Sequence, residues 1–566
     1  MMSLSLPRED QPSTRAVFWF FVLAFVVLAA GIGLRAPWPA DEPRFVLVAK
    51  QMWESGDWWF PHRGQELYSD KPPLYFWLLC ASYAVFRDWD WAYLWPSLVA
   101  AMATLWLTWD FARRLWTPRA GLWAMLGVLC AFQFVYQGKR AQIDPTVVAF
   151  ITLGVYGIGR HVLLGPAWRW YWLGCFAAGL GVISKGVGFL ALLALLPYFL
   201  MRWRGWQGLA EPAPRGAARW WLGAGAFLLA IGLWFVPMLS LALLDGDAGH
   251  RAYLDDLLFR QTATRYVSAW HHHKPAWYFV EVVLLYWLPF SAFLPWLVQP
   301  WREAWRARDA RVWWPLAWAL LVFVFFSASP GKRDMYILPA LPMVAVAAAP
   351  YLEALSRRAG LRWLLFGLVL AMGLGFAVAG GMAALGDPKF AVKFEAERGL
   401  QAAGAHVMWW SMAALGGLLC ALAAWLRPRR AAVLALAMNV AVWLFYALAL
   451  APMLDEENSG RGLMQAAREH VGPNTVIGLV DWREQLLLQA TGPVTEFGFR
   501  VPADEQWRRG IAWLGESSSA PRILLGQGSD AMPACLDRNR LRGLGAANRR
   551  DWWLVDRDAV RDCVGR

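Results

Sequence analysis

The chain has 566 residues, of which 58% are hydrophobic and only 17% are charged. Soluble domains carry nearer a quarter of charged residues, so this composition excludes an ordinary soluble protein and indicates a polytopic membrane protein. The formal net charge is +13, but the basic residues lie mostly in short loops between apolar runs, where they act as topology signals and do not indicate nucleic-acid binding.

The apolar runs predict about thirteen membrane-spanning helices, since a span needs about 17–25 mostly apolar residues. The first run, Val17 to Leu34, is followed by Pro37, Trp38 and Pro39 rather than by a small-residue cleavage site, so we expect a retained anchor. A shorter run at 72–87 begins with two prolines and is expected to lie at the membrane interface. The predicted spans are 17–34, 93–112, 120–136, 143–163, 170–184, 186–201, 219–241, 278–296, 312–328, 334–352, 361–383, 407–426 and 431–451.

Alternate loops between these spans are rich in arginine, which is typical of cytoplasmic loops. This pattern places the N-terminus in the cytoplasm of a bacterium, and an odd number of spans places the tail in the periplasm. We therefore expect a multi-pass inner-membrane protein with a membrane domain, 1–454, whose external loops are 36–92 and 242–277. The basic loops contain Arg113, Arg114 and Arg119; Arg202, Arg204, Arg215 and Arg219; Arg302, Arg306, Arg308 and Arg311; Arg357, Arg358 and Arg362; and Arg427, Arg429 and Arg430.

The tail, 455–566, is predicted to be a small soluble α/β domain on the periplasmic side. The stretches "TVIGLV", "RILLG" and "WWLVD" have the composition of strands, and "GRGLMQAAREHV" has that of a helix. Cys535 and Cys563 both lie in this tail. An oxidising compartment permits a disulfide between them, but their spacing is equally compatible with two thiols. The other four cysteines lie in apolar segments and are expected to be packing residues.

Several basic residues lie on the side of the membrane where topology does not require them. A charge near the centre of a span costs about 2.5–3.5 kcal/mol, so their gathering on one side indicates a shared anionic partner, and phosphate at the headgroup level fits Arg and Lys best. The alternative is that they are snorkelling side chains that anchor helix ends. They are Arg44, Lys71, Lys139, Arg140, Lys185, Arg260, Arg265, Lys274, Lys332 and Arg333.

Acidic residues are fewer on that side, and Asp41, Glu42 and Asp144 are the most informative. Asp144 precedes Pro145 at the expected start of a span, where it has two interpretations, a helix cap and a functional acid. The glycine-rich "GLGVISKGVGF" lacks the spacing of a P-loop, so its glycines are expected to allow a close backbone approach while Lys185 reaches a phosphate.

Three adjacent histidines, His271, His272 and His273, stand in "YVSAWHHHKPAWYF". Neighbouring histidines point in different directions, so interfacial polarity is one interpretation of this run. A metal site completed by Asp70 or another remote acid is the other.

One long stretch, "DEPRFVLVAKQMWESGDWWFPHRGQELYSDKPPLYFW", resembles the first external loop of bacterial lipid-linked-sugar glycosyltransferases of the GT-C fold. These enzymes are in the protein mannosyltransferase-like superfamily, and the resemblance is to the branch of the lipid A aminoarabinose transferases. Further similar motifs follow in family order as "KRAQIDPTVVAF", "GVISKGVGFLALL", "RYVSAWHHHKPAWYF" and "SPGKRDMYILPALP". The resemblance spans most of the membrane region, to about Leu352, and departs from the branch where "SKGVG" replaces Thr-Lys-Gly-Pro.

The resemblance implies transfer of a sugar from an undecaprenyl-phosphate-linked donor at the periplasmic face. By this resemblance Asp41 is the catalytic carboxylate and Asp144 the second acid. Lipid A phosphate is the leading acceptor, and a protein or polysaccharide hydroxyl is the alternative. The residues expected to contact the phosphate or sugar are Glu42, Arg44, Lys71, Lys185, Arg265, Lys332 and Tyr336.

The chemistry of such a site needs no metal, because Arg and Lys can stabilise the departing lipid phosphate, although a divalent metal stays open. A hydroxyl acceptor would need a general base, whereas a phosphate is already ionised near neutral pH, which would leave Asp41 to orient it. A single displacement predicts inversion at the anomeric carbon. We expect a monomer in membrane lipid. A transporter should carry its charges near mid-membrane, and an assembly factor is the third class considered.

Overall fold

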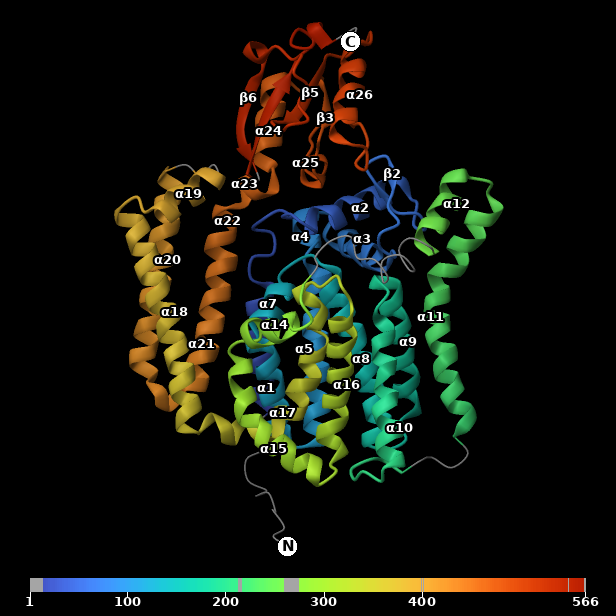
Figure 1. Ribbon diagram of the computed structural model, residues 1–566, viewed down its shortest axis with the longest axis vertical. Coiled ribbons are helices and arrows are strands. Elements are labelled where there is room, and N and C mark those ends of the chain that lie inside the picture. The colour runs from blue at the N-terminus through green and yellow to red at the C-terminus, as the bar shows by residue number, and fades with distance from the viewer. Residues whose placement is uncertain are drawn as a thin grey trace.

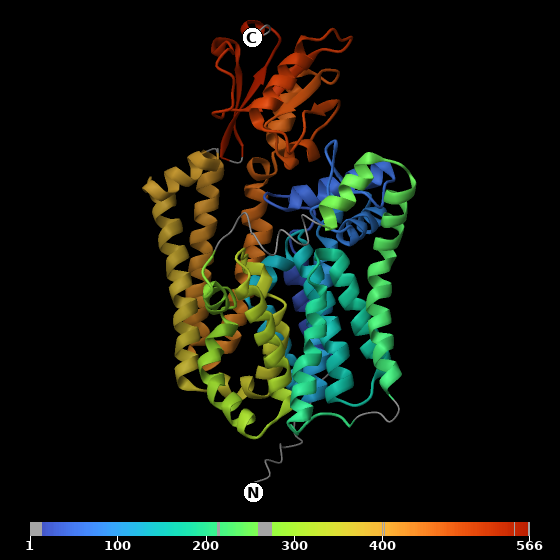
Figure 2. The same cartoon turned by 45° about the vertical axis from the view of Figure 1, so that its right-hand side comes forward.

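The computed structural model describes residues 14–211, 216–258, 274–398, 400, 402–547 and 549–563. Long helices stand side by side in one body, and the C-terminal tail sits on one end of that body (Figure 1). The turned view shows the same two parts, with a layer of short elements between them (Figure 2). This layer is built mainly by the first external loop of the sequence, with one short helix from the second.

The helical body contains helices that are apolar over most of their surface. Within the described ranges, five helical stretches are long and apolar enough to cross a membrane: α11 (Ala217–Leu244), α16 (Ala310–Ala328), α18 (Ala359–Leu385), α20 (Ala402–Leu426) and the run Pro428–Met453, which includes α21 (Ala431–Phe445). Other helices run beside them in Figure 1, among them α1 (Thr14–Ala29), α5 (Trp95–Leu115), α8 (Ile143–Leu163), α9 (Trp168–Lys185), α10 (Leu195–Trp203) and α17 (Ala340–Ser356).

Two of the predicted spans are broken by sharp bends. The first bends by 71° between α6 (Pro118–Cys130) and α7 (Phe132–Gly138), and the second by 101° between α14 (Tyr278–Tyr286) and the run Phe290–Arg306, which holds η3 (Phe290–Phe293) and α15 (Leu294–Arg306). Counting each bent pair as one span gives up to seven. Pro289 at the second bend has no N–H for the helix ladder. The bends meet where the Phe132 N–H donates to the Leu288 carbonyl over 3.0 Å.

A layer of short elements lies across the end of the body that faces the tail (Figure 1). The helix predicted at 72–87 is present as α3. Beside it lies α2, which begins next to Pro43 and ends at Gly56, whose positive φ of 73° suits glycine. The elements of the layer are α2 (Glu42–Ser55), the hairpin β1 (His62–Arg63) and β2 (Glu66–Leu67), α3 (Leu74–Phe86), α4 (Trp89–Ala92) and α12 (Ala248–Asp255).

The tail follows the last long helical run through α22 (Ala451–Met453) and α23 (Asp455–Ser459). Its sheet has the order β4-β3-β5-β7-β6, with β3 parallel to β4 and β5, and β7 antiparallel to β5 and β6. The three predicted strands and the predicted helix are present as β3 (Val476–Val480), β5 (Arg522–Gln527), β7 (Arg550–Val555) and α24 (Arg461–Val471), joined by β4 (Val494–Glu496), α25 (Glu484–Leu488), α26 (Ala503–Gly515) and β6 (Arg542–Ala547).

The tail is closed by a disulfide between Cys535 and Cys563, 28 residues apart, which decides between the two states left open by their spacing. Its core packs Trp507 and Leu524 between α26 and the sheet. The tail thus has a hydrophobic cluster of its own.

Candidate active site

Asp41 stands immediately before α2, at the junction of the helical body and the layer. Its Oδ2 accepts a hydrogen bond from Nη2 of Arg333 over 2.8 Å, and its Oδ1 lies 3.6 Å from Nη1 of Arg44. Burial opposes ionisation of this carboxyl, but Arg333 and Arg44 outweigh it and hold the pKa of Asp41 below its usual range. Asp41 is therefore a buried carboxylate held in its charged form by two guanidinium groups.

A second ion pair joins Asp144 to Lys185. Lys185 is the last residue of α9, and Gly186 ends that helix with a φ of 83°. The Nζ of Lys185 contacts Oδ1 of Asp144 and lies 5.0 Å from the ring centroid of Tyr336. Asp144 does not cap α8, because the residue before the helix is Gln142 and Asp144 lies inside the first turn. The capping interpretation is wrong, and the carboxylate is directed to Lys185.

The two ion pairs form one cluster, in which charges of each pair act on the other. Lys185 favours the ionised form of Asp41, and Asp144 favours the charged form of Arg333. The cluster joins residues from the start of α2, the start of α8, the end of α9 and η4 (Asp334–Ile337). Five of the residues predicted from sequence, Asp41, Arg44, Asp144, Lys185 and Tyr336, are thus brought together.

Glu42, the neighbour of Asp41, is turned into the protein. Its side chain is fully buried, and its two oxygens are bonded to Nη1 and Nη2 of Arg35 at 2.6 and 2.8 Å. They also accept from the backbone N–H groups of Trp38 and Ala141, and Arg140 lies at 3.8 Å. Glu42 therefore shapes the loop that carries Asp41, whereas the sequence suggested a contact with substrate.

The sequence predicted Lys332 as a substrate contact, but its neighbour Arg333 is the residue that reaches the cluster. The Lys332 ammonium is buried and donates to the carbonyls of Lys274 and Ser329, at 3.1 and 2.5 Å, so it ties two segments together. Arg333, which the sequence placed among the unexplained bases but not among the site candidates, is the residue that reaches Asp41. The backbone at Arg333 is extended, and successive side chains of an extended chain point to opposite sides.

Asp70 and Lys71 lie toward the tail. The Lys71 ammonium donates to the Asp70 carbonyl over 2.9 Å, and the Asp70 carboxylate is 3.4 Å from Nη2 of Arg500 in the tail. Arg265, His271, His272 and His273 lie outside the described residues. Among the residues that are described, no group of three or more His, Cys, Asp or Glu is arranged to hold a metal ion. The metal site that needed these histidines therefore stays an untested prediction.

The tail contributes one residue to the cluster that sequence reasoning missed. Oε1 of Glu484, the first residue of α25, is 2.8 Å from Nε of Arg44 and 3.6 Å from Nη1 of Arg63. No motif in the sequence connects this glutamate with a loop 440 residues earlier.

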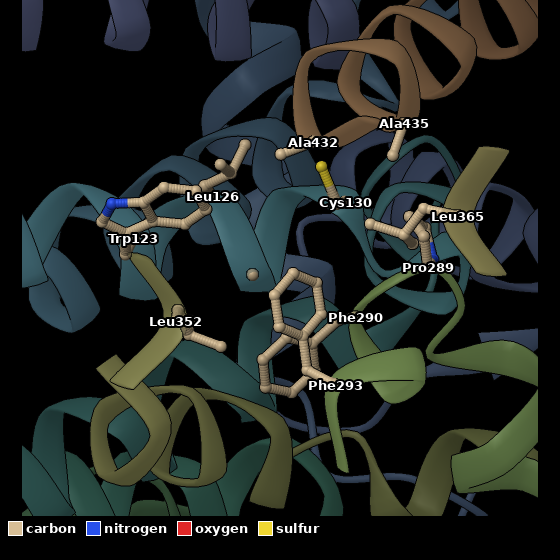
Figure 3. Close-up of a pocket in the computed structure, with 11 residues that line it drawn as sticks. Trp123, Leu126, Cys130, Pro289, Phe290, Phe293, Leu352, Leu365, Ala432 and Ala435 are labelled. Carbon is tan, nitrogen blue, oxygen red and sulfur yellow. The ribbon is translucent and has the colours of Figure 1, made fainter. Parts of the chain in front are cut away.

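An apolar pocket lies apart from the charged cluster, between α6, η3, α17, α18 and α21 (Figure 3). Phe290, Phe293 and Trp123 point into it. Its lining has no acidic or basic side chain. The pocket can accept apolar groups but cannot supply acid–base chemistry, so the charged cluster is the candidate site.

The chain is similar to several known proteins. Residues 70–231 match the family model described as dolichyl-phosphate-mannose-protein mannosyltransferase. A curated relative from Edwardsiella ictaluri, named undecaprenyl phosphate-alpha-4-amino-4-deoxy-L-arabinose arabinosyl transferase, is 30% identical over 383 residues, which cover 65% of this chain and 64% of that protein. A protein of the same name from Pseudomonas aeruginosa is 29% identical over 339 residues, covering 58% of this chain and 57% of the relative. The chain thus spans a little under two thirds of the length of these relatives.

The fold matches over a much larger share of the chain than the sequence does. The crystal structure of ArnT from Cupriavidus metallidurans bound to undecaprenyl phosphate superposes with a TM-score of 0.74 at 20% identity, covering 96% of this chain and 98% of that one. Its apo form gives 0.73. The resemblance predicted from the first-loop motifs is therefore confirmed.

Proposed function

We propose that this chain, which resembles the lipid A aminoarabinose transferases in sequence and has their GT-C fold, is a glycosyltransferase. It moves a sugar from a polyprenyl-phosphate donor to an acceptor, and lipid A phosphate is the acceptor that the site favours. The observation that carries the proposal is the charged cluster, in which two carboxylates lie among Arg44, Lys185 and Arg333 at one end of an apolar helical body.

The bases of the cluster suit the leaving group. When the bond between the sugar and the donor oxygen breaks, negative charge develops on a lipid phosphate. Preorganised guanidinium and ammonium groups stabilise such charge without any reorganisation at the moment of reaction. Arg44 and Lys185 are placed to do this, and the Tyr336 ring beside Lys185 offers a flat surface for a sugar.

The state of Asp41 favours a phosphate acceptor over a hydroxyl. A general base works best when its pKa is near the operating pH, but the pKa of Asp41 is lowered by its arginine partners. A phosphate with a second pKa of about 6 is largely ionised at neutral pH and needs no such base. Asp41 then orients the acceptor or contacts a cationic amino group on the donor sugar.

A hydroxyl acceptor on a protein or polysaccharide is the second candidate. The family model that matches residues 70–231 is named for transfer of mannose to protein. For this acceptor Asp41 would have to accept a proton, which requires loss of the Arg333 contact when substrate binds.

The arrangement in the membrane is part of the proposal. Residues 1–454 form the membrane domain with about thirteen crossings, several shorter than the five long apolar helices. Loops 36–92 and 242–277 and the tail 455–566 lie in the periplasm of a bacterial inner-membrane protein. The disulfide of the tail supports this side, because such bonds persist in oxidising compartments.

Mass spectrometry of lipid A from cells with and without the gene tests the function. A mass difference of a pentose or hexosamine supports the lipid A acceptor, and identical spectra favour the hydroxyl acceptor. Complementation with Asp41→Asn should lose the modification while the protein still inserts, because the acceptor or the donor sugar is no longer held in the reactive orientation. Asp504→Asn, an exposed acid of the tail, is the matched control and should behave as wild type.

A further inference from the structure

We propose that Glu484 of the tail is a positioning residue for the donor phosphate, because it holds Arg44 in the orientation that phosphate binding requires. This inference rests on the proposed function. It makes the tail part of the active site, whereas the sequence suggested an appended domain.

The geometry of Arg44 assigns different edges of one guanidinium to different partners. Nε of Arg44 donates to Oε1 of Glu484 over 2.8 Å, and Nη1 of Arg44 lies 3.6 Å from Oδ1 of Asp41. Nη1 of Arg44 therefore lies on the side of the cluster, where it can donate to an incoming phosphate, while Glu484 holds Nε. A guanidinium fixed on one edge loses less freedom when it binds an anion on the other.

Glu484 also lies close to a second arginine, Arg63. The same Oε1 lies 3.6 Å from Nη1 of Arg63, whose guanidinium stacks 3.7 Å from the ring centroid of Phe499 in the tail. Burial lowers the pKa of Arg63, Arg44 adds to this effect, and Glu484 opposes it. Without the shared carboxylate no anion would lie between the two guanidinium groups, and their mutual repulsion would turn Arg44 away.

The position of Glu484 follows from how the tail is seated. It begins α25 just after β3, so the carboxyl end of that strand faces α2 (Figure 1). Contacts on either side fix this orientation: Oε1 of Glu496 accepts from the Gln65 N–H over 2.8 Å, and Arg461 pairs with Asp90 over 2.6 Å. The Asp455 carboxylate accepts from the N–H of Ala36 and the indole of Trp38. The glutamate is thus held against Arg44 by the docking of a whole domain.

Electrostatics and positioning predict opposite outcomes when the charge of Glu484 is removed. Deleting a negative charge beside an anion site would by itself strengthen anion binding. Losing the support of Arg44 would weaken it. The sign of the change therefore separates a positioning residue from one that only competes with the ligand for Arg44.

The experiment measures direct binding of undecaprenyl phosphate to the purified full-length protein in nanodiscs, together with kcat and KM for the lipid-linked sugar. We expect Glu484→Gln to weaken undecaprenyl phosphate binding and lower kcat/KM by about 10- to 100-fold. Glu484→Asp, which keeps the charge, should recover part of the loss. Neutral undecaprenol should bind wild type and Glu484→Gln alike.

Glu505→Gln is the matched control, because it removes a tail carboxylate whose ion-pair partners, Arg508 and Arg509, lie within α26 itself rather than in the layer. It should leave both measurements unchanged. Equal or tighter undecaprenyl phosphate binding by Glu484→Gln would overturn the inference. If wild type itself fails to bind undecaprenyl phosphate, the proposed function fails instead. Resistance of the tail to protease checks that each variant is folded.

Discussion

Arg333 reaches across 292 residues of sequence to donate a 2.8 Å hydrogen bond to Asp41. The contact joins η4, between two long helices, to the loop that opens the layer. It fixes the charge state of the candidate catalytic carboxylate, since burial would otherwise favour its protonated form. Arg333 therefore controls at which pH Asp41 can act.

Arg333→Ala should move the acidic limb of the pH–rate profile upward. In wild type the pKa of Asp41 is lowered, so the ion pair is intact above the ordinary aspartate range and is lost only as pH falls through the depressed pKa. Without Arg333 less positive charge opposes the effect of burial, so the pKa of Asp41 should rise and the limb should move to higher pH. The profile of kcat/KM measures it. Arg333→Lys keeps the charge and should stay near wild type, and coincident limbs in Arg333→Ala and wild type would contradict the prediction.

Asp144 and Lys185 should behave as a unit in a double-mutant cycle. Asp144→Asn and Lys185→Met should each lower kcat/KM for the donor, because each leaves the other charge without its partner. The double variant should be less impaired than the two losses multiplied, with a coupling of about 0.5–3 kcal/mol. If the two free-energy losses simply add, the two residues act independently and the prediction is wrong.

Glu42→Gln should reduce stability rather than turnover alone. It leaves the buried guanidinium of Arg35 without its counter-charge, which costs about 3–5 kcal/mol when one partner of a buried pair is removed. Thermal unfolding of the detergent-solubilised protein measures the loss, and Asp41→Asn is the comparison, with stability retained. If the Glu42→Gln protein is fully stable but has no turnover, Glu42 acts on the substrate and the structural role is wrong.

Loss of the tail disulfide should destabilise the tail without touching the cluster. Closing a separation of 28 residues stabilises by about 3–4 kcal/mol in the chain-entropy description. Cys535→Ser should therefore make the tail sensitive to protease at lower denaturant concentration. Cys420→Ser, a change at a free cysteine, is the control, and equal sensitivity of the two variants would argue against the effect.

The reaction should invert the anomeric carbon, because the acceptor displaces the lipid phosphate in one step. NMR of the purified product gives the configuration directly. Net retention would require a covalent intermediate, with Asp41 or Asp144 as the nucleophile, and would exclude the single displacement.

Sequence reasoning located most of the cluster because its residues have strong local signals. Asp41 and Arg44 follow an apolar run, and Asp144 and Lys185 interrupt such runs, so each is a charge where lipid disfavours one. The tail strands were equally readable from their composition. Charges within apolar runs and the composition of strands depend only on residues that are neighbours in sequence, so they can be recognised from the sequence alone.

Other features depend on contacts that no local pattern records. The side of an extended chain to which Lys332 and Arg333 point is set by the partner across the fold. The burial of Glu42 follows from Arg35 and the Ala141 N–H, which belong to different segments. The bend after α6 lies where the Phe132 N–H donates to the carbonyl of Leu288 in a distant segment, and Glu484 reaches the site through the docking of the tail.

The ion pair of Arg44 with Glu484 has a consequence for the timing of biosynthesis. The two residues are 440 positions apart, so at a translation rate of about 5–20 residues per second Arg44 leaves the ribosome roughly 20–90 s before its partner. During this interval the membrane region is inserted with an incomplete site. If Glu484 positions Arg44 as proposed, the site is complete only once the tail has folded against the layer.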